Sequence, residues 1–221
     1  MLDLPMRSWT AWLADALHIR HACIAHSGHR AADALGKQIP RLAGTYYLGC
    51  VYLGVNDVRA PDWHAEAFER DLGQICPAMS EHACELLLLT IPTDLGRPRI
   101  SASAISAANT AIEHVAARHG AHLLDLRELR GWTFVLPDAV HLTARGEAHV
   151  ARLACRKLAA AGVTLDEHIL DVALRPFTLG TGLHYACGPY ARALSRNLRT
   201  RARTRLSRAS RVGRRHRRPL G

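Results

Sequence analysis

The chain has 221 residues, 48% of them hydrophobic and 22% charged, which fits one folded α/β domain and excludes a small disulfide-stapled module. Its formal net charge of +10 suggests a nucleic-acid-binding protein, but the excess lies at one end. Residues 192–221 hold twelve arginines and no acidic residue, whereas residues 1–191 hold 17 basic and 19 acidic ones. The basic charge therefore belongs to a tail, and the rest of the chain is close to neutral.

Three features of the sequence favour a cytoplasmic protein with reduced cysteines. The longest apolar stretch, Leu42–Val55, is shorter than the roughly 20 residues that span a bilayer. The N-terminus carries Asp3 and no apolar run, so it lacks the features of a secretory signal. The six cysteines are scattered without Cys-x-x-Cys spacing, which indicates mostly buried thiols rather than a disulfide framework.

Helical and strand-like segments alternate in the first part of the chain. Ser8 is a candidate N-cap for a helix that ends near Leu17, since apolar residues recur there at helical spacing. We expect the mildly apolar segment His18–Ala25 to form a strand, and Arg30–Ile39 to form a helix that the following proline ends. The continuous apolar and aromatic run Tyr46–Leu53 predicts a strand that is buried on both faces.

The same alternation continues beyond residue 60. The expected elements are a helix over residues 63–79 capped by Asp62, a leucine-rich buried strand Cys84–Ile91, a helix over residues 101–119, a strand His122–Leu126, and a helix from Thr143 to about Gly162. Strands that alternate with helices predict an α/β fold in which a parallel sheet carries helices on both faces.

The composition divides the chain into three parts. We expect an α/β domain over residues 1–165, an irregular extension over residues 166–191 that prolines and glycines interrupt, and an arginine-rich tail over residues 192–221. The tail is expected to begin as a basic helix and to end disordered. It is typical of a solvated extension; the alternative is weak, salt-sensitive attachment to nucleic acid or to an anionic membrane surface.

Three loops deserve a search for functional residues, because ligands of parallel α/β sheets bind at the carboxyl ends of the strands. The first loop contains Ser27-Gly28 and the second contains Gly54-Val-Asn56-Asp57, directly after a core strand. The third is Asp138-Ala-Val-His141, just before the helix that Thr143 opens.

Asp138 and His141 have the spacing of an acid–base pair. Three residues apart in a loop, the carboxylate can bond imidazole Nδ1, which fixes the tautomer and leaves Nε2 as a general base. The competing interpretation is an ordinary surface pair that caps a helix, because Asp-x-x-His alone is a weak signal.

The second loop can supply hydrogen-bond donors. Asn56 at the tip of a strand can direct its side-chain N–H at a developing oxyanion, and Gly54 permits close approach of backbone or substrate. Asp57 is expected to bond backbone groups and shape the turn. Gly28 could offer a backbone N–H to the same oxyanion. The competing interpretation is a pair of ordinary turns.

Together, the order and strand-end positions of these residues resemble the SGNH hydrolase (GDSL esterase/lipase) family. Cys-Ile-Ala-His-Ser-Gly28 resembles the family's second block, Gly54-Val-Asn-Asp57 its third block and Asp138-Ala-Val-His141 its last block; Pro92, Asn109 and Asp125 are softer matches. The likeness covers about residues 8–160. It implies a flavodoxin-like three-layer α/β/α fold and hydrolysis of small acyl esters without metal or cofactor. His141 would be the general base, Asp138 its orienting acid, and Gly28 with Asn56 the oxyanion hole.

The family's first block, a strand that runs into Gly-Asp-Ser-Leu with the nucleophilic serine, has no match in the sequence. In the family that strand lies between the strands expected at His18–Ala25 and Tyr46–Leu53, so these two must either close up or leave a gap. Three explanations stay open: a start codon assigned too late, a degraded gene, or a protein that lost the nucleophile and kept a binding role. Ser8, a helix cap, and Ser27, beside an oxyanion donor, are poor substitutes.

Two other functions compete with ester hydrolysis. His18, His21, Cys23, His26 and His29 form a cluster of potential zinc ligands, but an extended segment would place them on opposite faces, and their spacing matches no standard zinc site. We therefore expect no metal. The other alternative is a catalytically inactive SGNH-fold protein that attaches to anionic partners through residues 192–221.

Overall fold

Three parallel strands form the centre of the protein, a computed structural model of which describes residues 7–96, 100–131, 133–136 and 138–166. The strands are β1 (Tyr46–Val51), β2 (Ala83–Leu89) and β3 (His122–Leu124), in the order β1-β2-β3. Leu48 of β1 is paired with Glu85, and Leu87 of β2 with His122. The parallel α/β architecture expected from the sequence is thus confirmed.

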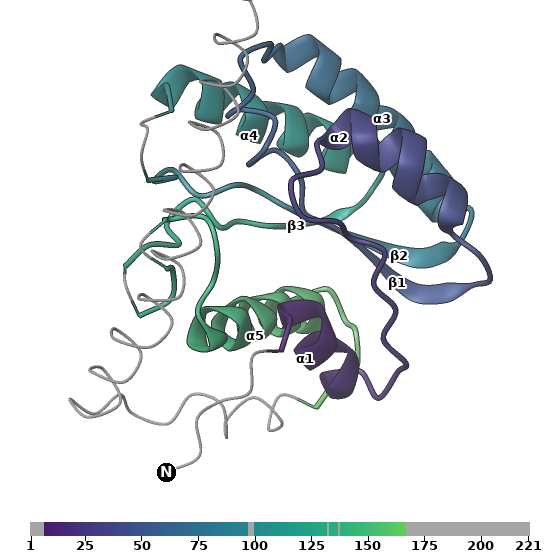
Figure 1. Cartoon of the computed structure of the whole chain (residues 1–221). Coiled ribbons are helices and arrows are strands. Elements are labelled where there is room, and N and C mark those ends of the chain that lie inside the picture. Colours follow the sequence, from purple (N-terminus) through teal and green to yellow (C-terminus); the bar gives the residue numbers. More distant parts are fainter. Residues whose placement is uncertain (1–6, 97–99, 132, 137, 167–221) are drawn as a thin grey trace, which may run out of the picture. The chain divides into compact units, whose positions relative to one another are not determined.

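Helices cover both faces of the sheet (Figure 1). On one face lie α1 (Trp9–Ala16) and α5 (Ala144–Ala160), which pack with Leu87 and Leu89. On the other face lie α2 (Ala31–Asp33), α3 (Ala65–Ser80) and α4 (Ala102–Arg118), which pack with Leu86 and Leu88. Successive leucines of β2 therefore point into two different cores, which explains why this strand is a continuous apolar run rather than an alternating one.

The helix starts follow the sequence signals in two of three cases. Ser8 Oγ accepts from Ala11 N–H at 3.3 Å, and Thr143 Oγ1 accepts from Gly146 N–H at 2.9 Å, as N-caps do. The expected cap at Asp62 is wrong: α3 starts at Ala65 after His64, and Asp62 instead forms an ion pair with Arg30 at 2.8 Å.

The expected helix over Arg30–Ile39 is irregular. After the short α2, a π-helical turn η1 (Ala34–Gln38) and a 3₁₀ turn η2 (Ile39–Arg41) continue the chain. Pro40 therefore lies inside the last turn rather than beyond the end, which its fixed φ and the looser 3₁₀ hydrogen bonding permit.

The strand expected at His18–Ala25 does not form. Residues 19–26 contain no regular secondary structure and are mostly exposed, including Cys23. Of the other described cysteines, Cys76 and Cys155 are buried but Cys84 is exposed, so the expectation of mostly buried thiols holds only in part. A strand needs a partner for its backbone groups, and this segment has none within the described sheet.

The outer edge of β1 is unpaired as a result. Tyr46 N–H donates to the His82 carbonyl at 2.7 Å, so the backbone groups of Tyr46 face β2. Because these groups alternate in direction along a strand, those of Tyr47, Gly49 and Val51 face away from β2. They form no hydrogen bond with any described residue, so this edge of the described sheet is open.

Two further expectations concern the C-terminal part of the chain and membrane-spanning helices. The predicted extension and the arginine-rich tail, residues 166–191 and 192–221, lie outside the described residues apart from Asp166. Within the described ranges, none of the helices has both the length and the apolar content that crossing a bilayer requires.

We predict that hydrogen exchange will distinguish alternate residues of β1. The amides of Gly49 and Val51 should exchange about 100-fold faster than those of Leu48 and Cys50, because only the latter two face β2. Amide exchange followed by NMR provides the measurement, with Leu48 and Cys50 as controls on the same strand. Equal protection of all four amides would show that another segment pairs with this edge in solution.

Candidate active site

Asp138 and His141 form a direct pair in the loop before α5. His141 Nδ1 lies 2.8 Å from Asp138 Oδ2, and the other carboxylate oxygen accepts from the backbone N–H groups of Val140 and His141 at 3.0 Å each. Since an ionised carboxylate only accepts, Nδ1 carries the proton and Nε2 is the basic nitrogen of the ring. This arrangement is the one that a general base with its orienting acid requires.

The loop that carries this pair is anchored on both sides. Thr143 N–H donates to the Phe134 carbonyl at 2.9 Å, and Thr143 Oγ1 donates to the Thr133 carbonyl at 2.6 Å. Ala139, between the two partners, adopts a left-handed conformation with φ 54°, which costs a non-glycine residue about 1–2 kcal/mol. The hydrogen bonds around the turn therefore hold the pair in a geometry that the backbone would not adopt by itself.

Asp138 is anionic at neutral pH. Its side chain is 24% exposed, and this burial alone would raise its pKa. The hydrogen bonds from the His141 ring and from the backbone outweigh burial and lower the pKa of Asp138 to about 2. The carboxylate can therefore stabilise a protonated His141, whose own side chain is 65% exposed.

One hydrogen bond, to the residue after Gly28, holds the Asn56 side chain next to the Gly28 turn. The Asn56 side-chain Nδ2 donates to the carbonyl of His29 at 2.9 Å, which uses one of its two N–H groups and fixes the amide. Gly28, the residue before His29, has φ +83°, and its N–H donates to no described residue. One amide N–H of each residue is thus left for a further acceptor.

Asp57 and Gly54 shape the turn that presents Asn56. Asp57 is only 7% exposed; its two oxygens accept from the backbone N–H groups of Ala31 at 2.9 Å and Gly54 at 3.2 Å. Gly54 has φ +114°, and a Cβ there would lie 3.2 Å from Ile91. Only glycine fits this conformation and this space, so both residues hold the loop rather than contact a ligand.

A third loop connects the two halves of the site. Arg59, just after the Asn56 turn, donates a hydrogen bond to the Leu95 carbonyl. The next residue, Gly96, packs against the loop of Asp138 and His141 so closely that a Cβ would lie 2.6 Å from the Asp138 carbonyl oxygen. Contacts therefore run from Asn56 to Asp138 through residues 95–96. The pairs Asp138–His141 and Gly28–Asn56 are each brought together, while no described hydrogen bond joins His141 directly to Asn56 or Gly28.

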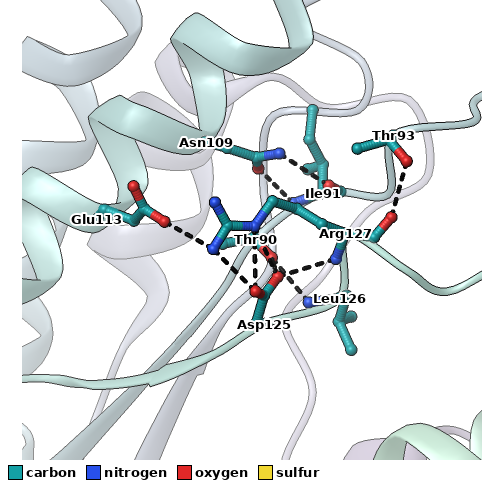
Figure 2. A network of polar contacts seen from close by, with 8 residues as sticks. All are labelled: Thr90, Ile91, Thr93, Asn109, Glu113, Asp125, Leu126 and Arg127. Atoms are coloured by element: carbon teal, nitrogen blue, oxygen red, sulfur yellow. Dashed lines mark hydrogen bonds and ion pairs between the residues drawn. The ribbon is translucent and has the colours of Figure 1, made fainter.

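A polar network that the sequence analysis largely missed fixes the carboxyl ends of β2 and β3 (Figure 2). Thr90 Oγ1 donates to Asp125 at 2.9 Å and accepts from Leu126 N–H at 2.7 Å. Arg127 forms ion pairs with Asp125 at 2.8 Å and with Glu113 of α4 at 2.9 Å. The Arg127 hydrogen bonds lower the pKa of Asp125 to about 2. Two sequence signals pointed toward this network: Asp125, a soft family match, and Thr90, the polar residue that ends the leucine run.

Asn109, a soft match in the sequence, attaches α4 to β2. Its side chain accepts from Ile91 N–H at 2.7 Å and donates to the Ile91 carbonyl at 3.0 Å, as Figure 2 shows. The amide therefore pairs with the chain just past β2 as a neighbouring strand would. This contact sets where the loop of residues 92–96 leaves the sheet.

The histidine-rich segment makes other contacts. His21 Nε2 lies 2.9 Å from Thr10 Oγ1, His29 Nδ1 lies 2.9 Å from Gln38, and the rings of His26 and His29 stack at 4.3 Å. In the part of the chain that the structure describes, no three His, Cys, Asp or Glu side chains are grouped to hold a metal ion.

A separate cavity of about 330 Å³ lies beside β3. It is lined by alanines of α4 and α5 and of the segments that follow them, together with Glu113, His122, Leu123 and Lys157. None of the candidate residues borders it, so this cavity is separate from the candidate site.

Protonation of Asp138 should weaken the fold. Because its folded pKa of about 2 lies below its ordinary 3.8, its contribution is complete above about pH 4 and is lost as the pH falls toward 2. Between pH 5 and pH 2.5, we expect the unfolding free energy of wild type to fall by about 1–2 kcal/mol more than that of Asp138→Asn. Urea titrations at each pH measure this; parallel curves would show that the pair does not stabilise the protein.

Several solved structures share this fold. The α/β hydrolase LAE5 from the metagenome of Lake Arreo is 21% identical with a TM-score of 0.57, and the match covers 71% of this chain and 82% of that one. The acetylxylan esterase Axe2 from Geobacillus stearothermophilus is 16% identical with a TM-score of 0.55, and the match covers 69% of this chain and 81% of that one. TesA is 21% identical with a TM-score of 0.56, and the match covers 69% of this chain and 88% of that one. At these identities the likeness shows the fold.

The family follows from the sequence itself. No curated protein matches the chain. The GDSL-like lipase/acylhydrolase family, in contrast, matches residues 3–149, well over half of its length. That stretch contains the Gly28, Asn56 and Asp138–His141 loops, and the three-layer fold agrees with it. The chain therefore belongs to the GDSL-like lipase/acylhydrolase family.

Proposed function

We propose that this chain supplies the base, its orienting acid and the oxyanion hole of a hydrolase that cleaves small acyl esters by a Ser-His-Asp mechanism. The observation that carries the proposal is the Asp138–His141 pair at 2.8 Å, connected through residues 95–96 to the turn of Asn56. Family membership supports ester hydrolysis as the reaction class. The nucleophile would lie in a Gly-Asp-Ser block that the 221 residues do not contain.

Each residue then has one task in acyl transfer. His141 Nε2 takes the proton from the serine hydroxyl while the serine oxygen attacks the ester carbonyl carbon. The carbonyl oxygen, on which negative charge develops, accepts hydrogen bonds from Gly28 N–H and from the second Nδ2–H of Asn56. His141 returns the proton to the leaving alcohol, and a water molecule then releases the acyl group by the same route.

Asp138 acts through His141. Its carboxylate keeps the proton on Nδ1 and stabilises the imidazolium that forms in each step. Its low pKa supports this role, because a carboxylate that stays ionised over the neutral range can balance that positive charge.

The alternative is a catalytically inactive protein of the same fold. The sequence contains no Gly-Asp-Ser, and its twelve arginines in residues 192–221 could attach it to anionic partners. The two proposals differ in one requirement, since only the hydrolase needs a serine upstream of Met1.

The decisive test begins with the genomic DNA upstream of Met1, read in frame for a hydrophobic strand followed by Gly-Asp-Ser. We expect the extended protein to hydrolyse p-nitrophenyl acetate and His141→Ala to lower kcat by about 10³-fold or more, because the base is lost. His114→Ala, a substitution at an exposed histidine of α4, should leave the rate unchanged.

Two outcomes would contradict parts of this account. Turnover that survives His141→Ala would refute the assignment of the base. An extended protein with the serine but without any turnover, or an upstream region without such a block, would favour the binding protein over the hydrolase.

A further inference from the structure

Glu147 joins two helices next to the candidate site. It lies in the first turn of α5, six residues after His141, and its Oε2 accepts from the backbone N–H of Trp9 at 2.7 Å. Trp9 is the first residue of α1, so this bond connects the starts of two helices that are 138 residues apart in the chain. Nothing in the acyl-transfer scheme above uses this carboxylate.

The direction of the side chain brings it toward the catalytic loop. Side chains of a helix point toward its N-terminus, and in α5 that end leads to Thr143 and then to His141. Glu147 N–H donates to the Thr143 carbonyl at 2.9 Å, so the residue is one turn above the cap. Its carboxylate therefore lies at the start of α1, at the end of α5 that continues into the His141 loop.

The charge of Glu147 is confined and only partly compensated, so its pKa is raised overall. The side chain is partly buried where α1 and α5 pack together, and burial raises its pKa. The Trp9 N–H and the positive charge of His141 act in the opposite direction. The charge also acts on Tyr52, the residue that follows β1: burial and the negative charge of Glu147 both raise the pKa of this phenol. The helix dipole at the start of α1 further favours an anion there.

We infer that Glu147 is a positioning residue for His141, a second carboxylate that fastens α1 to the start of α5 and holds negative charge beside the imidazole. Asp138 acts on the ring by a direct bond, and Glu147 acts through the helix start and through space. The effect of Glu147 on catalysis rests on the proposed role of His141 as the base. The structural contact and the electrostatic coupling do not depend on turnover.

Two substitutions separate the bond from the charge. Glu147→Gln keeps an oxygen that can accept from Trp9 N–H but removes the charge, whereas Glu147→Ala removes both. Glu66→Gln is the matched control, because Glu66 occupies the first turn of α3 on the opposite face of the sheet. All three variants can be made in the 221-residue chain.

The first readout is the titration of the His141 ring by NMR, assigned among the 14 histidines by its absence in His141→Ala. In Glu147→Gln we expect its midpoint to move to lower pH, because a nearby negative charge no longer favours the imidazolium. The shift should shrink at high salt. Glu66→Gln should leave the midpoint unchanged.

The second readout is exchange of the Trp9 amide proton. It should stay near the wild-type rate in Glu147→Gln and become about tenfold faster in Glu147→Ala, which removes its acceptor. If Glu147→Ala does not fold, the glutamine variant still decides the electrostatic part.

An unchanged His141 midpoint in Glu147→Gln would overturn the inference, as would an unchanged Trp9 amide in a folded Glu147→Ala. Because neither readout needs ester turnover, an inactive extended protein would refute the proposed function and leave this inference standing. Conversely, an active enzyme with an unshifted His141 would refute the inference alone.

Discussion

Hydrogen bonds from buried side chains to backbone groups hold the carboxyl edge of this sheet, and the candidate site depends on them. The described residues include four buried polar or charged ones: Asp57, Thr90, Asn109 and Thr143. Asp57, Thr90 and Thr143 lie at loops that follow a strand or precede α5, and Asn109 reaches such a loop from α4; each of the four bonds backbone atoms there. A buried polar group without a partner costs about 1–3 kcal/mol, so these bonds strongly favour one arrangement of the loops.

The remaining features of the site follow from that rigidity. Ala139 stays left-handed and Gly96 stays in contact with the Asp138 carbonyl because the flanking segments cannot relax. Asp138 is thereby held where its carboxylate meets His141 and two backbone donors. Asp57 likewise holds the turn of Asn56 in place, because its carboxylate accepts from the backbone N–H groups of Ala31 and Gly54. The exposed imidazole and the exposed Gly28 are thus supported by residues buried beneath them.

The sequence predicted those parts of the fold that local patterns determine. The leucine run of β2, the caps Ser8 and Thr143 and the alternation of strands with helices each follow from short-range signals, and all are present. The pairing of Asp138 with His141 was likewise accessible, since three residues of separation in one loop allow few other arrangements.

The parts that the sequence did not predict depend on tertiary partners. The segment His18–Ala25 has strand-like composition but no neighbour to pair with, and Asp62 finds Arg30 in place of a helix start. Likewise, Glu147 meets Trp9 and Arg127 meets Glu113 only because the fold brings distant elements together. Periodicity carries no information about such contacts.

The central claim is that one opening is lined by His141 on one side and by the donors Asn56 and Gly28 on the other. A crystal structure of the chain tests it through the distance from His141 Nε2 to Asn56 Nδ2. The account predicts about 6–8 Å, the span that a serine hydroxyl and an oxyanion can bridge with hydrogen bonds of about 3 Å. A separation beyond about 12 Å, or an imidazole that faces away from the Asn56 turn, would contradict it.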